Sequence, residues 1–525
     1  MIGRPDRLTA RIGNEPVALQ SRSENRWEYR DLIVKLRREK NASVVEIQSP
    51  QSSVNEVTLE WTLGRRSFPS VMNDHWERTY GDVSWHAPSA EEVLPWYFMA
   101  VEGGIAYGFG VKTGARAFCF WQVEGTRLRL TLDLQNGGTG VELGDRTLRA
   151  AEIVAMQGEK GETPFAASRR MMHMMCGKAR MPGAPVYGIN DWYFTYGRNS
   201  EALIMEHTQL MAPLADGLSN RPFSVIDAGW YEASPFVKND TCWGERMDMP
   251  NGNFGAMDRL AEKIRQVGMR PAIWTRPLCG HSKDPASLML PLVKDRRAAK
   301  PVLDPTIPEN AERIKRYFTL YRQWGYDMVK FDFTTFDLLG KWGFEMTREK
   351  KLTESGWSFH DRSKTNAEIV LDLYRMIREA SGGMLLIGCN TVSHLSAGLF
   401  ELNRIGDDNS GNEWARTRKM GVNTLAFRGV QHGIFYAADA DCVGLTTKIP
   451  WEKNRQWMEL VARSGTPLFI SAQKEAVGTV QKEAIRESFR RASREQPLAE
   501  PLDWLESAVP STWRLNGETV RFNWD

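Results

Sequence analysis

Short apolar runs recur along the chain, and the way they alternate with polar residues changes near residue 186. Before that point the runs are separated by turn residues, and residues 127–133, RLRLTLD, alternate apolar and polar positions almost without a break. Alternation of this kind is typical of a half-solvated antiparallel strand. The pattern therefore predicts an all-β region over residues 1–165, interpreted as a β-sandwich. No buried charged motif stands out in this region, so a catalytic role is not expected for it.

A helix is predicted at the end of this region. Residues 163–176 have helical spacing and include RRMMHMMC, which raises the alternative of a metal or haem ligand at His173. Methionines at helical spacing are more often gap-filling core residues, so we interpret the segment as structural. With the run RMPGAP that follows it, the segment predicts a connecting helix and linker over residues 166–185.

From residue 186 onward, strand-like apolar runs alternate with helical periodicity. The predicted strands are residues 186–190, 224–227, 270–274, 328–333, 385–388, 402–405, 434–437 and 468–471. The clearest helices are residues 256–266, 309–324, 367–380, 413–428 and 452–463. Eight strand–helix units predict a (β/α)8 barrel over residues 186–475, although residues 389–401 are too short for a full helix. A doubly wound open sheet is the competing architecture, but no GxGxxG motif follows an early strand.

The remaining residues, 476–525, predict a short C-terminal extension. Residues 483–492 are a charged helical stretch, and Asn516–Gly517 is typical of a hairpin turn within residues 512–525. The expected fold is thus multidomain, α/β and all-β, with a β-sandwich followed by a TIM barrel. A chain of 525 residues is long enough for two or three domains.

Composition and charge limit the kinds of molecule that the protein is expected to bind. The net charge is only +3, from 68 basic and 65 acidic residues, so neither a nucleic-acid nor a membrane partner is expected. No apolar run is long enough to span a membrane, and the N-terminus lacks signal-peptide character. The compartment stays open, since a trimmed secretion signal would leave the same sequence. The oligomeric state, including a homo-oligomer, also stays open.

The cysteines and histidines give no sign of a metal site, and the many tryptophans favour a sugar as the ligand. Six scattered cysteines include no CxxC pair, and eight histidines include no HExxH motif, so no metal or cofactor is expected. Nineteen tryptophans offer flat apolar surfaces that stack on sugar rings or on bases. Without a basic excess, an oligosaccharide or glycoside is the expected ligand.

Charged residues collect where the predicted barrel strands end. Residues 328–333 carry Lys330 and Asp332 in an otherwise buried strand, where a charge is costly unless it is paired or functional. A structural Lys–Asp pair is the alternative. The other predicted strand ends carry Trp192, Asp227, Trp230, Trp274, Arg276, Cys389, Asn390, Arg404, Asp407, Asp408, Asp439 and Asp441. Barrel enzymes place their chemistry at these ends, and carboxylates mixed with indoles predict a carbohydrate site.

Two of these carboxylates suit the chemistry of glycoside hydrolysis. Asp332 and Asp408 follow the fourth and sixth strands and face each other across the mouth, as a pair flanking a glycosidic bond must. Lys330 points to the same side as Asp332 and favours an ionised nucleophile. Asp407 beside Asp408 is expected to raise the pKa of Asp408, which suits a general acid. The alternative for residues 407–408 is a solvated loop or a helix N-cap.

Several motifs together resemble the clan D α-galactosidases, glycoside hydrolase families 27 and 36, and family 36 most closely. They are LDP…PE…GYDMVKFDF in residues 303–333, IDAGW at 226–230, GMRPAIWTRP at 268–277, GCN at 388–390, RIGDD at 404–408 and DADCVG at 439–444. Their order matches that of the family along nearly the whole chain, and an N-terminal sandwich before a barrel also fits family 36.

The resemblance implies a retaining mechanism, with Asp332 as nucleophile and Asp408 as acid/base. It also implies a set of substrate-binding residues: Asp227, Lys330, Arg404, Trp192, Trp230, Trp274, Cys389 and Asn390. Two positions depart from the family: Ala228 stands where a second aspartate grips galactose, and Arg276 stands where family 36 often has glutamate. From the sequence given, we expect the C-terminal β-domain common in family 36 to be missing or shortened.

The sequence therefore predicts a retaining exo-α-glycosidase that is α-galactosidase-like. Three alternatives remain: a related enzyme with another terminal sugar, a transglycosylase on the same scaffold, and a non-catalytic carbohydrate-binding relative.

Overall fold

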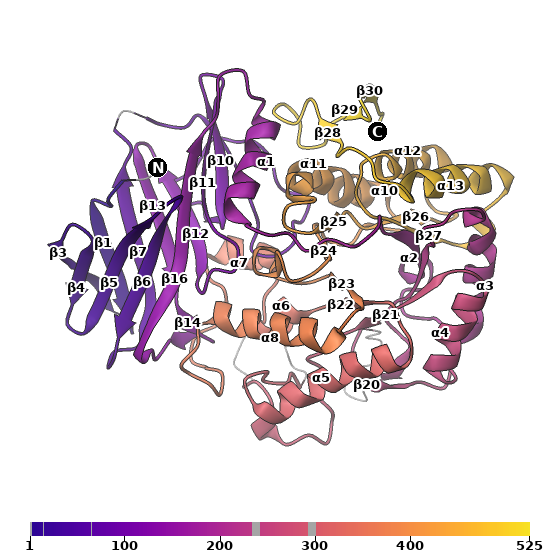
Figure 1. Ribbon diagram of the computed structural model, residues 1–525, viewed down its shortest axis with the longest axis horizontal. Helices are drawn as coiled ribbons and strands as arrows, with labels where there is room; N and C mark the ends of the chain where they lie inside the picture. The colour runs from indigo at the N-terminus through magenta and orange to yellow at the C-terminus, as the bar shows by residue number, and fades with distance from the viewer. Residues whose placement is uncertain (1–2, 14, 65, 234–241, 292–300) are drawn as a thin grey trace.

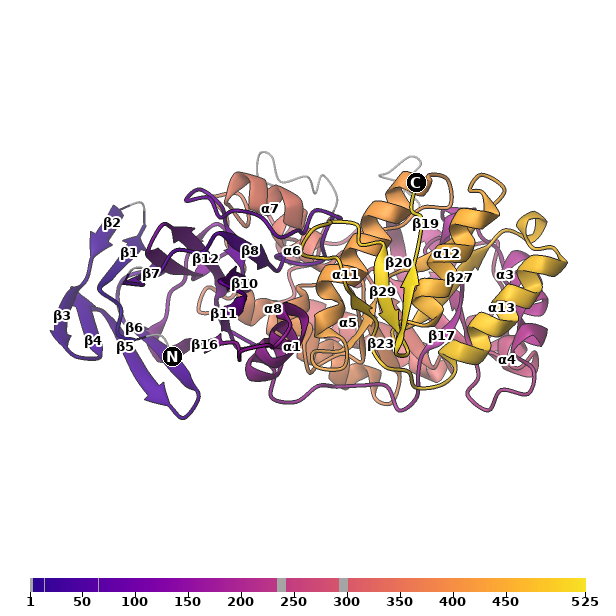
Figure 2. The same ribbon diagram turned by 90° about the horizontal axis from the view of Figure 1, so that it is seen from above.

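The computed structural model describes residues 3–13, 15–64, 66–233, 242–291 and 301–525. Figure 1 shows an all-β body at the N-terminus beside a mixed α/β body, with the C-terminal strands lying over the second body. Figure 2, seen from above, shows the two bodies in a row along the long axis, with the helix α7 at their boundary. This is the order of sandwich and barrel that the sequence predicts.

The N-terminal body consists of two antiparallel sheets. A six-stranded sheet has the order β2-β1-β7-β13-β12-β9, and an eight-stranded sheet the order β3-β4-β5-β6-β16-β11-β10-β8. Their strands are β1 (Arg7–Ile12), β2 (Glu15–Ala18), β3 (Gln20–Ser23), β4 (Arg26–Tyr29), β5 (Leu32–Glu39), β6 (Ala42–Ser49), β7 (Val54–Thr62), β8 (Ser70–Asn73), β9 (Leu94–Pro95), β10 (Tyr97–Glu102), β11 (Ile105–Val111), β12 (Phe118–Glu124), β13 (Arg127–Asp133) and β16 (Gly144–Gln157). The ribbon β14 (Gln135–Asn136) with β15 (Thr139–Gly140) lies apart from both sheets.

The sandwich is held by the apolar face that its alternating strands present. Leu128, Leu130 and Leu132 of β13 are fully buried, as the alternation predicts. Trp121 of the first sheet packs against Phe98 of the second, with ring centroids 6.0 Å apart. Burying large aromatic rings between two sheets is the main apolar contribution to such a core.

The connecting helix α1 (Pro164–Met175) confirms the structural interpretation of its methionines. Thr163 caps the helix by accepting a hydrogen bond from the backbone of Ala166. Met171 and Met172 are fully buried, whereas His173 is exposed. A Cβ atom at Gly108 of β11 would lie 2.9 Å from the Met171 sulfur, so the helix lies close against the sheet.

The second body is a closed parallel barrel. Its strands, β17 (Tyr187–Asn190), β18 (Phe223–Ile226), β21 (Arg270–Thr275), β22 (Met328–Phe331), β23 (Leu385–Gly388), β24 (Leu402–Arg404), β25 (Ala437–Asp439), β26 (Cys442–Leu445) and β27 (Leu468–Ala472), form one nine-stranded parallel sheet. The two ends of this sheet are β25 and β26, which are separated in the chain only by Ala440 and Asp441. The sheet therefore closes on itself, with its seventh strand broken in two.

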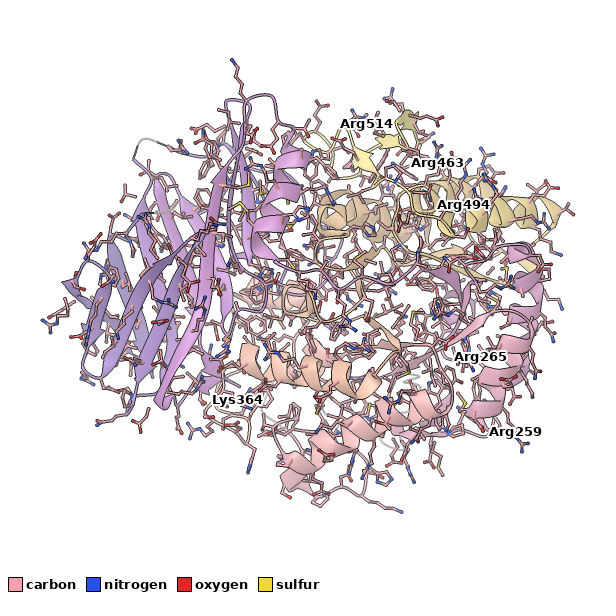
Figure 3. All side chains as sticks on the ribbon, viewed as in Figure 1. Arg259, Arg265, Lys364, Arg463, Arg494 and Arg514 are labelled. Atoms are coloured by element: carbon pink, nitrogen blue, oxygen red, sulfur yellow. The ribbon has the colours of Figure 1, made fainter. Side chains whose placement is uncertain are left out.

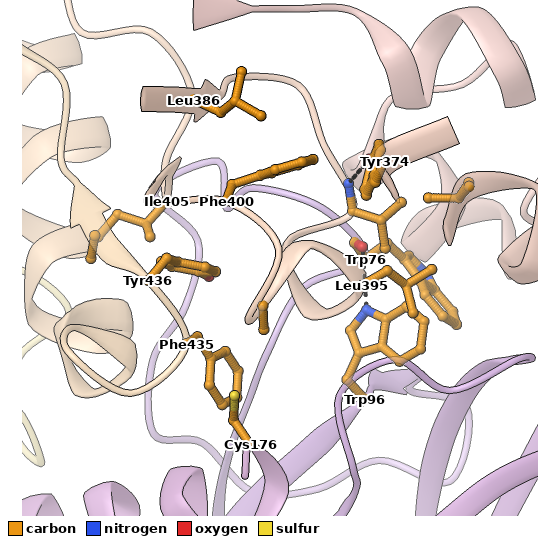
Figure 4. Packing of buried hydrophobic residues seen from close by; sticks show 14 of the residues in the cluster. Trp76, Trp96, Cys176, Tyr374, Leu386, Leu395, Phe400, Ile405, Phe435 and Tyr436 are labelled. Atoms are coloured by element: carbon orange, nitrogen blue, oxygen red, sulfur yellow. Dashed lines mark hydrogen bonds between the residues drawn. The ribbon is translucent and has the colours of Figure 1, made fainter. Parts of the chain in front are cut away.

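The predicted seventh strand, residues 434–437, is wrong in position. The barrel uses Ala437–Asp439 and Cys442–Leu445 instead, because the apolar run before them packs at the boundary with the first body. Figure 4 shows Phe435 beside Cys176 of the connecting segment. The ring of Phe435 lies 5.9 Å from that of His394, which in turn stacks on Trp96 of the sandwich at 4.6 Å.

Helices cover the barrel at most of the predicted places. They are α2 (Trp192–Thr195), α3 (Glu201–Met211), α4 (Met257–Gln266), α5 (Pro308–Gln323), α6 (Thr334–Leu339), α7 (Gly343–Glu349), α8 (Asn366–Ser381), α9 (Ser393–Ser396), α10 (Trp414–Thr417), α11 (Thr424–Arg428), α12 (Trp451–Ala462) and α13 (Thr479–Ala492). Short 3-10 turns are η1 (Ala212–Ala215), η2 (Ala286–Leu288), η4 (Gly429–Gln431) and η5 (Lys474–Ala476). The predicted helix over residues 413–428 contains a π-helical segment, η3 (Arg418–Asn423), between α10 and α11. The outer helices are amphipathic: on α4 Leu260 is buried, whereas Arg259 is exposed and points outward (Figure 3).

The chain ends in a small sheet, as the turn chemistry predicts. The strands β28 (Glu500–Pro501), β29 (Thr512–Leu515) and β30 (Glu518–Arg521) pair antiparallel. Elsewhere in the chain, after β18, the strands β19 (Tyr231–Ala233) and β20 (Gly244–Pro250) form a separate two-stranded sheet. Asn516 and Gly517 turn the hairpin with φ of 52° and 85°. Within the part of the chain that the structure describes, no helix is long and apolar enough to cross a membrane.

Candidate active site

The C-terminal ends of the barrel strands bring most of the predicted residues to one rim. Lys330 lies on β22 with Asp332 just beyond it, Asp227 follows β18, and Asp408 follows β24. The Lys330 Nζ lies 2.8 Å from the Asp227 Oδ2, and Arg404 Nη1 donates to Asp408 Oδ1 at 3.1 Å. Asp332 and Asp408 keep solvent exposure, whereas Asp227, Lys330 and Arg404 are buried around them.

Asp332 is held by neutral hydrogen-bond donors. Its Oδ1 accepts from the backbone N–H groups of Phe333 at 2.7 Å and Asn390 at 3.0 Å. Its Oδ2 accepts from the Trp274 indole at 3.3 Å. Phe333 adopts the left-handed region, with φ of 62°, at the point where its N–H meets this carboxylate. Such a conformation is costly for a residue with a side chain and is found preferentially at functional sites.

The structural Lys330–Asp332 pair, which was the alternative interpretation, is not formed, and Lys330 pairs with Asp227 instead. The same Asp227 oxygen also accepts from the Asn190 side chain at 2.6 Å. Burial acts to lower the pKa of Lys330, but Asp227 together with Cys389 and Asp332 outweighs it and holds that pKa well above its usual value. Asp191 lies beneath and accepts from the Asp227 backbone at 2.7 Å, and burial, reinforced by Asp227, raises the pKa of Asp191 to about 7.

Asp408, in contrast, lies between guanidinium groups. Arg404 Nη1 lies 3.1 Å and Arg78 Nη1 3.8 Å from its Oδ1. Arg78 Nη2 also lies 2.8 Å from Asp407, and Arg416 pairs with Asp407 at 2.7 Å. Burial acts to raise the pKa of Asp408, but Arg78 and Arg404 overcome it and hold the pKa below its ordinary value. The expectation that Asp407 would raise this pKa is wrong, because these cations pair with both carboxylates.

Arg404 organises the carboxylates beyond the sixth and seventh strands. Its Nε lies 3.3 Å from Asp439 and its Nη2 2.7 Å from Asp441, in addition to Asp408. Asp441 also accepts a hydrogen bond from the Tyr193 hydroxyl. Asp441 has φ of 73° and stands in the break between β25 and β26, so the broken strand places this carboxylate on Arg404.

The sandwich contributes to the same rim, against expectation. The segment after β8, residues 74–80, runs beside the end of β24: the Thr79 N–H donates to Ile405 at 3.0 Å, and Asp407 donates back to Thr79 at 2.8 Å. This pairing carries Glu77 and Arg78 into the barrel mouth. The sequence signal is DHWERTY, a dense polar and aromatic cluster that departs from the strand alternation around it.

Glu77 links the sandwich to the loop that holds Asp332. Its side chain accepts hydrogen bonds from the amide of Asn390 and from the hydroxyl of Tyr80, and the Gly343 N–H donates to it at 2.9 Å. Asn390 is fully buried and also accepts from the Phe336 N–H at 3.0 Å. That Asn390 contacts substrate stays a prediction; in this structure its side chain is bonded to Glu77 and Phe336, and its backbone N–H donates to Asp332.

The predicted tryptophans divide into two kinds. Trp192 is half-buried at the rim, with its ring 5.7 Å from that of Tyr196. Trp274 directs its indole at Asp332. Trp230 is fully buried and donates to the Trp274 carbonyl at 2.8 Å, and its contact with a sugar stays a prediction. Its ring packs in the core against Tyr321.

Three further positions complete the rim. Cys389 is buried, its Sγ lies 3.9 Å from Arg78 Nη1, and burial together with Asp332 raises its pKa. Arg276 is buried, pairs with the buried Asp337 at 2.7 Å, and its guanidinium lies 3.9 Å over the Phe333 ring. Ala228 is buried, so no polar side chain stands at that position. Among the described residues, no group of three His, Cys, Asp or Glu side chains could hold a metal ion.

Comparison with known proteins identifies the fold. No protein-family model and no curated protein sequence matches the chain. The α-galactosidase TtGalA from Thermus thermophilus, solved with p-nitrophenyl α-D-galactopyranoside, is similar with a TM-score of 0.64, covering 98% of this chain and 99% of that one at 17% identity. A variant of the GH36 α-galactosidase AgaA from Geobacillus stearothermophilus, solved with 1-deoxygalactonojirimycin, has a TM-score of 0.60, covering 89% and 68% at 14% identity.

A third solved structure has a different ligand. A variant of Kfla1895 in complex with cyclobis-(1->6)-alpha-nigerosyl is similar with a TM-score of 0.54, covering 100% of this chain and 87% of that one at 12% identity. The resemblance to family 36 that the motifs indicate is confirmed at the level of fold. The chain has the sandwich-and-barrel architecture of these α-galactosidases.

Proposed function

We propose that this protein is a retaining exo-acting α-glycosidase, most similar in its chemistry to an α-galactosidase. One observation carries the proposal: two partly exposed carboxylates, Asp332 and Asp408, stand on one rim of a barrel of this fold, each held by buried donors. Glycoside hydrolysis needs two carboxyl groups at the bond that is cleaved.

In the first step, the Asp332 carboxylate attacks the anomeric carbon while the bond to the leaving oxygen breaks. Asp408 gives its proton to that oxygen, which leaves as an alcohol, and a glycosyl-enzyme forms. In the second step, Asp408 takes a proton from water as that water attacks the same carbon. The bond to Asp332 breaks, and the sugar leaves with its original anomeric configuration.

The buried groups around the pair would bind the terminal sugar. Asp227 and Lys330 offer an acceptor and a donor for its hydroxyl groups, and Trp192 offers an apolar ring at the rim. Arg404 is engaged with three carboxylates and would act mainly by orienting Asp408. No step of this mechanism needs a metal ion or a cofactor.

A terminal sugar other than galactose is the second candidate. Ala228 removes a carboxylate that the related enzymes are expected to use, and Arg276, at a position where glutamate is expected, pairs with Asp337. The neighbour solved with a nigerosyl sugar also indicates that this fold accommodates different glycosides.

A panel of p-nitrophenyl α- and β-glycosides tests the proposal. We expect cleavage of at least one α-glycoside and of no β-glycoside, with the α-anomer of the free sugar formed first by proton NMR. First appearance of the β-anomer would overturn retention. Product that carries an added acceptor sugar would favour the transglycosylase alternative, and binding of a glycoside without any cleavage would favour the non-catalytic one.

A further inference from the structure

Arg276 is a buried cation close to Asp332 that the proposed mechanism does not use. It directly follows the barrel strand β21, and its side chain is 3% exposed. The guanidinium packs on two aromatic rings, at 4.0 Å from the centroid of Trp243 and 3.9 Å from that of Phe333. A planar cation is attracted to the face of an aromatic ring, so these contacts fix where the guanidinium lies.

The same guanidinium binds the side chain of Asp337, which is fully buried in the helix α6. Arg276 Nε donates to Oδ2 at 3.1 Å and Nη2 donates to Oδ1 at 2.7 Å, a two-point bond that suits the planar fork of arginine. The Asp337 N–H donates to the Phe333 carbonyl at 2.8 Å and so forms the first turn of α6. Arg276 therefore contacts this turn at both ends, through the ring of Phe333 and through the carboxylate of Asp337.

Phe333 needs support of this kind because its backbone lies in the left-handed region. Its φ is 62° and its ψ is 5°, a conformation that is costly for a residue with a Cβ atom. In this conformation the Phe333 N–H donates to Asp332 Oδ1 at 2.7 Å. A change to extended or right-handed backbone at Phe333 would turn the peptide plane that carries this N–H relative to α6. Asp332 would then lose one of its two backbone donors.

We infer that Arg276 is a positioning residue for Asp332, and that it acts by holding Phe333 in the left-handed conformation. This inference rests on the proposed function, in which Asp332 is the nucleophile, and deepens it. A glutamate, which the motif resemblance leads us to expect at position 276, would repel Asp337 and bring no cation to Phe333. Arginine at this position is thus part of the way in which this chain fixes its nucleophile.

The test changes the arginine and the strained residue separately, with the p-nitrophenyl α-glycoside that the wild type cleaves best. Arg276→Met should lower kcat roughly 10²-fold and change KM less than about twofold, because a misplaced nucleophile slows the chemical step more than it weakens binding. Glycine adopts the left-handed conformation freely, whereas alanine does not. Phe333→Gly should therefore lower kcat less than about fivefold, and Phe333→Ala roughly as much as Arg276→Met.

The decisive variant combines Arg276→Met with Phe333→Gly. Its kcat should be at least roughly tenfold higher than that of Arg276→Met alone, because glycine reaches the required backbone without the support of the arginine. A double variant as slow as Arg276→Met would overturn the inference, since the arginine would then act by another route. Equal kcat values for Phe333→Gly and Phe333→Ala would overturn it too, because the strain at Phe333 would not matter.

A matched control lies at the other end of the barrel. Arg378 pairs at 2.8 Å with the buried Glu401, which directly precedes β24 and so lies away from the mouth. Arg378→Met should lower the melting temperature but leave kcat within about twofold of the wild type. If its kcat fell as much as that of Arg276→Met, the loss would be a general effect of breaking such an ion pair, and the inference would be overturned.

Failure of the proposed function has a different signature. A wild type that cleaves no α-glycoside refutes the proposed hydrolase and the positioning role with it, whereas an active wild type with an unchanged Arg276→Met refutes the positioning role alone. Circular dichroism of each variant measures whether its fold is retained. If Arg276→Met does not fold because Asp337 is left buried and unpaired, Arg276→Met/Asp337→Leu replaces the pair with apolar side chains and takes its place, with the same expected outcomes.

Discussion

The surroundings of the two carboxylates differ in kind. Asp332 is fixed by two backbone N–H groups and an indole, whereas Asp408 lies between the guanidinium groups of Arg404 and Arg78. Neutral donors fix geometry with little effect of ionic strength, which suits a nucleophile that must reach one carbon. Cations favour the ionised form, which suits a base but makes protonation as an acid harder. The two residues are the same chemically, and their neighbours separate the roles that we propose for them.

The largest loss of activity is expected on substitution of Asp332, the carboxylate that is held by neutral donors. Asp332→Ala should lower kcat by at least about 10⁴-fold, because the covalent step has no other nucleophile. Added azide should restore activity by occupying the space of the carboxylate and should yield the β-glycosyl azide, measured by NMR. An α-glycosyl azide from this variant would contradict the assignment of nucleophile.

Asp408→Ala is expected to have a smaller effect that depends on the leaving group. General acid catalysis is worth roughly 10²- to 10⁴-fold, and an activated leaving group needs little of it. kcat/KM should therefore fall strongly for an alkyl or sugar α-glycoside and weakly for the 2,4-dinitrophenyl one. Equal losses with both substrates would show that Asp408 does not protonate the leaving oxygen.

Arg78→Met tests the cationic side of the comparison. Arg78 lowers the pKa of Asp408, so its removal should raise that pKa and enlarge the protonated fraction at a given pH. The high-pH limb of kcat/KM, where the general acid loses its proton, should then move to higher pH, with a loss at the optimum of roughly tenfold. Arg418→Met is a matched surface control, since Arg418 pairs with Asp525 away from the mouth. An unmoved limb in Arg78→Met would contradict the role of that cation.

The smallest effect is expected for Trp274→Phe. This change removes one long hydrogen bond of 3.3 Å to Asp332 but leaves both backbone donors in place. A loss of about fivefold in kcat, with little change in the pH profile, would follow from a neutral positioning donor. A shifted profile would mean that the indole also controls ionisation, and the contrast between the two sites would weaken.

The barrel could be predicted because the information is local. Runs such as residues 385–388 are short, apolar and bounded, and the rule that parallel strands present their ends on one rim gathers Lys330, Asp332 and Arg404 without further knowledge. The seventh strand failed because the apolar residues before Ala437 pack against the connecting segment, and periodicity alone cannot distinguish such packing from a barrel strand.

The ionisation of Asp408 could not be predicted in the same way. Its neighbour in sequence is Asp407, but Arg78 lies hundreds of positions earlier in the chain and reaches it only through the fold. The surroundings of Trp230 and Asn390 could not be predicted for a related reason: the sequence places both at strand ends, but the direction of each side chain depends on packing partners such as Tyr321 and Glu77.

The pairing of Thr79 with the end of β24 has a consequence for recombination between related chains. A chimera that takes its barrel from this protein and its sandwich from a relative would exchange Glu77 and Arg78 as well, and would give Asp332 and Asp408 foreign neighbours. To keep the surroundings of both carboxylates, the chimera would need a fusion point that leaves residues 74–80 with the barrel. The smallest segment that could be exchanged with the surroundings of both carboxylates intact is therefore the barrel together with residues 74–80.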